Sequence, residues 1–161
     1  MTKTLIASIL CAAALTFAGQ PAFAADSAPP AKAEAASPLA PARALIAEKK
    51  WAAAIEELKK VNATGNADWN SLMGYSMRKA KTPDYAGAEK YYDEALRIDP
   101  KHRGALEYSG ELYLMLGDLP KAEQRLATLD KACTFGCEEY TDLKKAVQGY
   151  KANGNRYVAA Q

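Results

Sequence analysis

The chain is poor in the side chains from which metal and catalytic sites are built. Its 161 residues include one histidine and three cysteines, which leaves little material for a multi-ligand metal site or a serine–histidine–acid set. The formal net charge is only +2, whereas nucleic-acid binding usually requires a clear basic surplus. About half of the residues are apolar and a quarter are charged, a balance typical of a globular protein of one or two domains. We expect no catalytic activity, no cofactor and no metal site.

The first 24 residues have the layout of a secretory signal peptide. Lys3 precedes an apolar run over residues 5–18, and Ala22-Phe23-Ala24 forms a small-residue cleavage signal. The run is shorter than the roughly 20 apolar residues that a membrane-spanning helix needs. We therefore expect cleavage after Ala24, a periplasmic or secreted protein, and no stable membrane insertion after cleavage.

The remaining chain divides into three segments by composition. Residues 25–37 are rich in alanine and proline and contain no large apolar side chain, which predicts a disordered leader. Residues 38–152 carry amphipathic helical patterns and form the predicted folded domain. Residues 153–161 are expected to be a flexible tail.

A period of 34 residues organises the folded part. Within each block the repeated apolar residues are three or four positions apart, which places them on one face of a helix. A second helix precedes each block, and Gly74 and Gly110 hold corresponding places in it, where a small residue lets two helices approach closely. Asp99-Pro100 ends one helix, and Asp118 is placed to cap the next. The repeated sets are Trp51, Tyr85 and Leu119; Ala54, Ala88 and Ala122; Leu58, Tyr92 and Leu126; and Val61, Ala95 and Leu129.

This pattern resembles the tetratricopeptide repeat family over residues 38–131. The first repeat matches only at Trp51, Ala54 and Leu58, and Lys81-Thr82-Pro83 replaces the usual turn glycine of the middle repeat. The resemblance implies an all-α solenoid of about three helix-turn-helix repeats, and the apolar face of residues 137–152 predicts a C-terminal capping helix. The matching residues are Trp69, Gly74, Tyr85, Ala88, Tyr92, Ala95 and Pro100 in the middle repeat, and Gly110, Tyr113, Gly117, Asp118, Ala122 and Leu126 in the last.

The resemblance also implies a partner-binding groove, because the first helix of each pair lines the concave surface in this family. We expect a groove that is basic at one end and acidic at the other, with Tyr75 as an aromatic anchor for a protein or peptide partner. The acidic residues argue against a clamp for a terminal carboxylate, and ordinary solvated helix faces are the alternative interpretation. The matching positions are Ser71, Tyr75, Arg78, Lys79, Glu107, Glu111, Leu114 and Met115.

Cys133 and Cys137 are the only pair that could carry redox chemistry. They are separated by three residues that include a glycine, and a secreted protein would form a disulfide there, fixing the capping helix to the last repeat. The alternative is a thiol-redox or metal-handling pair on a repeat platform, because Cys137 would begin a helix whose N-terminus stabilises a thiolate. His102 lies in a turn between repeats and is expected to be an ordinary surface residue.

Overall fold

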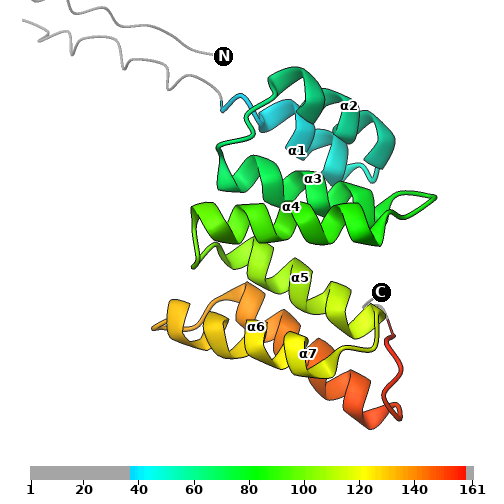
Figure 1. The fold of residues 1–161 in the computed structure, drawn as a ribbon, viewed down its shortest axis with the longest axis vertical. Helices are drawn as coiled ribbons and strands as arrows, with labels where there is room; N and C mark the ends of the chain where they lie inside the picture. The colour runs from blue at the N-terminus through cyan, green and yellow to red at the C-terminus, as the bar shows by residue number, and fades with distance from the viewer. Residues whose placement is uncertain (1–36, 159–161) are drawn as a thin grey trace, which may run out of the picture. The chain divides into compact units, whose positions relative to one another are not determined.

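The computed structural model describes residues 37–158, so the predicted signal peptide and all but the last residue of the predicted leader lie outside the described residues. Within residues 37–158 the chain forms helices and no strand (Figure 1). The predicted all-α fold is confirmed. The helices are α1 (Ala40–Ala47), α2 (Trp51–Val61), α3 (Ala67–Lys79), α4 (Tyr85–Ile98), α5 (Arg103–Met115), α6 (Leu119–Ala132) and α7 (Glu138–Ala152).

The 34-residue period marks the starts of the second helices. The helices α2, α4 and α6 begin at Trp51, Tyr85 and Leu119, which are the residues of the first repeated set. Side chains at the preceding positions fix two of these starts. The backbone N–H of Gly87 donates to the Asp84 carboxylate over 2.8 Å, and that of Lys121 donates to the Asp118 carboxylate over 3.1 Å. The predicted cap at Asp118 is therefore present.

The helices pack as hairpins that stack on one another. The pairs α1–α2, α3–α4 and α5–α6 are in contact, and α3 also contacts α5, which in turn contacts α7. We call the side on which α3, α5 and α7 lie next to one another the inner face. Because α3 and α5 have neighbours on several sides, they bury more of their residues than α4 and α6 do.

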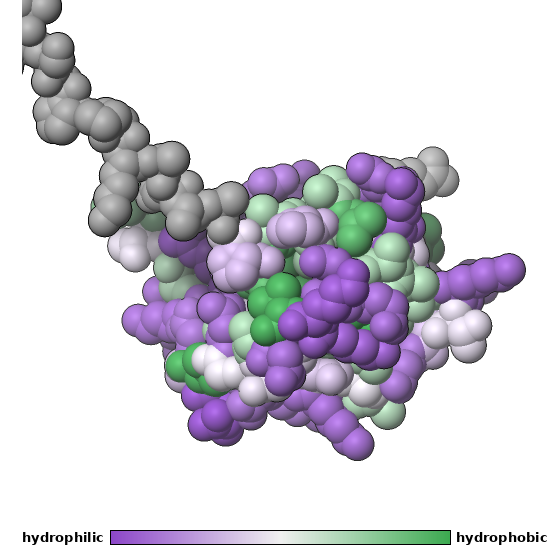
Figure 2. All heavy atoms as spheres, turned by 90° about the horizontal axis from the view of Figure 1, so that it is seen from above, coloured by the Kyte–Doolittle hydropathy of each residue, from purple (hydrophilic) through white to green (hydrophobic). Residues whose placement is uncertain are grey.

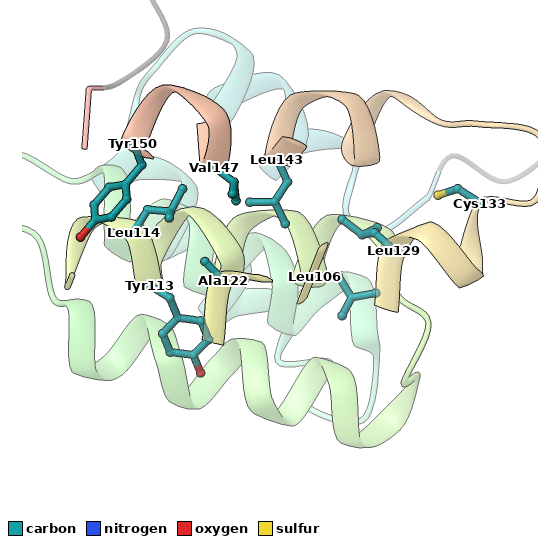
Figure 3. Packing of buried hydrophobic residues seen from close by; sticks show 9 residues of the cluster. All are labelled: Leu106, Tyr113, Leu114, Ala122, Leu129, Cys133, Leu143, Val147 and Tyr150. Atoms are coloured by element: carbon teal, nitrogen blue, oxygen red, sulfur yellow. The ribbon is translucent and has the colours of Figure 1, made fainter. Parts of the chain in front are cut away.

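A hydrophobic cluster joins α7 to the last hairpin, and we call it the cap cluster. Leu143, Val147 and Tyr150 lie on the apolar face of the predicted capping helix, and all three are buried. Figure 3 shows them pointing from α7 into the cluster, with Tyr150 beside Leu114. The terminal helix therefore covers the apolar surface that a repeat stack leaves at its end. The cluster consists of Leu106, Tyr113, Leu114, Ala122, Leu129, Cys133, Leu143, Val147 and Tyr150.

The other end of the stack is formed by α1 and α2. Seen from that end, hydrophobic side chains form separate patches among hydrophilic ones (Figure 2). The buried side chains of this region include Leu39, Ala42 and Leu58, which pack with residues of α3 in a second cluster. The short helix α1 thus packs on the apolar side of α2 and α3.

Gly74 and Gly110 permit close helix approach, as predicted from their corresponding positions in two repeats. They face different neighbours. A Cβ atom at Gly74 would lie 2.8 Å from the ring of Tyr92 and 3.0 Å from the carbonyl oxygen of Ala88, both in α4. A Cβ atom at Gly110 would lie 2.5 Å from the side chain of Leu143 in α7. Gly74 therefore sets the spacing within a hairpin, and Gly110 sets the spacing between the last hairpin and the cap.

We predict that Gly74→Ala lowers the free energy of unfolding by about 1–2 kcal/mol, because overpacking outweighs the gain in helix propensity. Gly149→Ala is the matched control, because Gly149 lies within α7 and a Cβ atom there would have no other atom within 4 Å. That variant should gain about 0.5–1 kcal/mol from helix propensity alone. Urea unfolding of both variants measures the difference. Equal shifts in the same direction would contradict the close-approach role of Gly74.

Candidate functional site

Arg78 occupies the centre of the inner face. Arg78 is only 3% exposed. Its Nη2 donates to the Glu111 carboxylate over 2.6 Å, and this hydrogen bond links α3 to α5. The guanidinium carbon lies 5.4 Å from the ring centroid of Tyr75 and 6.0 Å from that of Tyr108. A carboxylate and two aromatic faces therefore compensate the charge of a buried arginine.

Three partly exposed aromatic rings form a row beside this arginine, and we call them the ring ladder. The ring centroids of Trp51 and Tyr75 lie 5.7 Å apart in an edge-on arrangement, and those of Tyr75 and Tyr108 lie 4.4 Å apart. The three residues come from α2, α3 and α5, so the row crosses consecutive hairpins. Large, rigid aromatic side chains of this kind are enriched in protein–protein interfaces.

The structure separates the predicted groove residues into buried and accessible sets. Ser71, Arg78 and Leu114 are 2%, 3% and 1% exposed, so they form the floor or the core and offer no free surface. The expected division into a basic and an acidic end is wrong for Arg78, because its ion pair with Glu111 neutralises both charges where they meet. The accessible or partly accessible set is Tyr75, Lys79, Glu107, Glu111 and Met115.

Acidic side chains border the inner face on the α7 side. Glu107, Glu111 and Asp142 line a hollow of about 450 Å³ that also includes Lys145. A smaller hollow of about 210 Å³ adds two glutamates from the first turn of α7. We call the carboxylates of both hollows the acidic rim, which consists of Glu107, Glu111, Glu138, Glu139 and Asp142.

Glu107 is the rim residue whose ionisation is most disturbed. Burial raises the pKa of its carboxyl group, and the nearby charges of Glu111, Asp142 and Glu139 raise it further against a smaller opposing effect of Arg78. The resulting pKa is about 8, compared with an ordinary value of 4.5. At pH 7 the folded protein therefore favours a protonated Glu107, which leaves the other carboxylates to carry the negative charge of the rim.

This raised pKa predicts a loss of stability with rising pH. Below pH 4.5 Glu107 is protonated in both states, and between pH 4.5 and about 8 only the folded state keeps the proton. Stability should therefore fall as the pH rises through this window, and Glu107→Gln should remove that part of the dependence. Urea unfolding from pH 4 to pH 9 tests this, with exposed Glu56→Gln as the control. Parallel curves for wild type and Glu107→Gln would contradict it.

A second link between hairpins was missed from the sequence. The His102 ring accepts a hydrogen bond from the Ala105 backbone N–H through Nδ1, at 3.0 Å, and thereby caps α5. Its Nε2 lies 2.8 Å from the Asp68 carboxylate, which also accepts from Arg43 at 2.9 Å. Asp68 and His102 are 34 residues apart, so the repeat period contained the signal. His102 is thus part of a network that connects α1, α3 and α5.

Cys133 and Cys137 form a disulfide with a Cα–Cα distance of 5.6 Å. Cys133 is 7% exposed and belongs to the cap cluster, and Cys137 immediately precedes α7. The bond therefore joins the end of α6 to the start of the cap, as the structural interpretation of the pair expected. Among residues 37–158 no group of three or more His, Cys, Asp and Glu side chains is arranged to hold a metal ion. The thiol-redox alternative remains a prediction.

We predict that Cys133→Ser/Cys137→Ser lowers the free energy of unfolding by about 2 kcal/mol, the loop-entropy value for so short a loop. Thermal unfolding with and without a mild thiol reductant measures the effect. The double variant is its own control, because its Tm should not respond to the reductant. If the wild-type bond is reduced by a mild thiol reductant while the fold keeps its stability, the pair is a redox site and the structural interpretation fails.

Comparison with known proteins identifies the repeat. Residues 83–147, which span α4, α5, α6 and much of α7, match the family model described as a tetratricopeptide repeat. This part of the chain is a tetratricopeptide repeat region, and such repeats generally mediate protein–protein interaction and are typically non-catalytic. No curated protein matches the sequence. Within the described residues, no helix combines the length and the apolar character required to cross a membrane.

Proposed function

We propose that this chain is a non-catalytic adaptor that binds a segment of another protein along its inner face, in the periplasm or outside the cell. The observation that carries the proposal is the ring ladder. Trp51, Tyr75 and Tyr108 stay partly exposed although they stack on one another and beside the buried Arg78. The signal-peptide pattern of residues 1–24 supports export.

The acidic rim supports a partner segment that carries basic residues. The ladder offers apolar contact area, and the carboxylates of Glu138, Glu139 and Asp142 lie on the α7 side of the same face. Complementary charge sets the orientation and the rate of association more than the affinity, while aromatic contacts supply binding energy. A helix or an extended segment laid across α3, α5 and α7 meets both features.

Capture from a periplasmic extract tests the proposal with paired variants. We expect a partner that wild type retains and that Tyr75→Ala loses by at least about tenfold, since truncating an interface aromatic often costs more than 1.4 kcal/mol. Tyr91→Ala is the matched control, because Tyr91 is partly exposed on α4, away from the ladder. Equal capture by wild type and Tyr75→Ala would contradict the assignment to the inner face.

A second pair of variants tests the charge complementarity. Glu139→Lys/Asp142→Lys reverses two charges of the rim, and Glu56→Lys/Asp130→Lys makes the same change at exposed positions of α2 and α6. Only the first variant should weaken partner binding, and the difference should shrink as salt is added. Circular dichroism verifies that both variants keep the helical fold.

A further inference from the structure

The segment after α7 turns back toward the inner face. Gly154 and Asn155 have φ values of 64° and 60°, in the left-handed region that glycine and asparagine tolerate best. The Asn155 backbone N–H donates to the Tyr150 carbonyl oxygen over 2.9 Å, and the Asn153 side chain donates to the Gly149 carbonyl oxygen over 2.8 Å. Figure 1 shows the chain running from the end of α7 back toward the C-terminal end of α5. The predicted flexible tail, residues 153–161, begins with this turn, and its last three residues lie outside the described residues.

Tyr157 fixes the returning segment on the inner face. It packs against the cap cluster and borders two hollows, one with Glu107 and Glu111, and another of about 460 Å³ with Met115 and Tyr85. Burial raises the pKa of Tyr157, Glu111 raises it further, and Arg78 lowers it. Tyr157 borders both hollows, and it shares one of them with Glu111.

The contacts of this segment are few. Tyr157 is its only partly buried side chain, whereas Arg156 and Val158 are exposed. Val158 lines the same hollow as the acidic rim although it is 66% exposed. A segment held by one turn and one ring opens at low cost, since local stability follows the number of buried apolar contacts.

We propose that residues 153–158 are a built-in competitor for the inner face, and that a partner segment docks there by displacing Tyr157 from its place beside Glu111. This inference rests on the proposed function. The effective concentration of such a tethered segment is of the order of millimolar, so it weakens partner binding without abolishing it.

The bound tail also indicates one feature of the partner. Tyr157 is the partly buried side chain of the tail, and it borders both hollows. A segment that replaces the tail should therefore carry an aromatic residue that takes the place of Tyr157.

The tail sequence itself supplies the probe. An acetylated and amidated peptide of residues 153–158 is titrated into the full-length Tyr157→Ala variant, and backbone amide shifts in α3 and α5 are followed by NMR. We expect the peptide to bind this variant at least about tenfold more tightly than it binds wild type, whose own tail competes. The same peptide with alanine at the tyrosine position should not bind. Equal binding to both proteins, or binding to neither, overturns the proposal.

Control variants separate displacement from loss of stability. Tyr140→Ala removes another tyrosine that packs against the cap cluster but lines none of the hollows that Tyr157 borders, so its peptide affinity should equal that of wild type. Asn155→Ile disturbs the left-handed turn and keeps Tyr157, and it should raise peptide affinity above the wild-type value. Tighter binding by Tyr140→Ala equal to that of Tyr157→Ala would also overturn the proposal.

The test is independent of the partner. If the peptide fails to bind while Tyr75→Ala still abolishes capture of an exported protein, the competitor role is wrong and the proposed function stands. If the peptide binds Tyr157→Ala selectively but nothing is captured through the ring ladder, the tail occupies a face that has no such partner. The two proposals therefore fail separately.

Discussion

The pairing of Arg78 with Glu111 is the interaction on which the inner face depends. It places a buried cation between two hairpins and pairs it with one carboxylate over 2.6 Å. Removing one partner of such a pair leaves an uncompensated buried charge, at a cost of about 3–5 kcal/mol. The pair therefore fixes how α3 lies against α5. The rings of Tyr75 and Tyr108 flank the guanidinium, 5.4 Å and 6.0 Å from its carbon atom.

The terminal helix serves the fold and the candidate site together. One face of α7 supplies Leu143 and Val147 to the cap cluster and ends the repeat stack. Its first two turns place Glu139 and Asp142 in the acidic rim, and its C-terminal turn starts the segment that returns to Tyr157. The disulfide at Cys137 joins the start of this helix to the last hairpin. A change in the position of α7 would therefore alter the core, the rim and the tail at once.

Much of the fold was predictable because a repeat encodes it in local patterns. One set of residues spaced by 34 positions begins α2, α4 and α6. Another set with the same spacing is completely buried and consists of Ala54, Ala88 and Ala122. Helical periodicity, a capping aspartate and a small residue at a close contact each act within a few residues of the chain, or repeat at a fixed interval. The capping helix followed from the same reasoning, because an unpaired apolar face at the end of a stack needs a cover.

The site was predictable only as a set of positions. The sequence by itself determined the helices, their pairing and which residues of α3 and α5 lie near the inner face. The tertiary structure alone decided which of these residues are accessible: Ser71, Arg78 and Leu114 are buried by neighbouring helices, and the returning tail places Tyr157 among them. Periodicity specifies the direction of a side chain relative to its own helix. Exposure and charge pairing depend on neighbours more than thirty residues away, such as Glu111 for Arg78, and the periodicity of a single helix does not specify which neighbour a side chain meets.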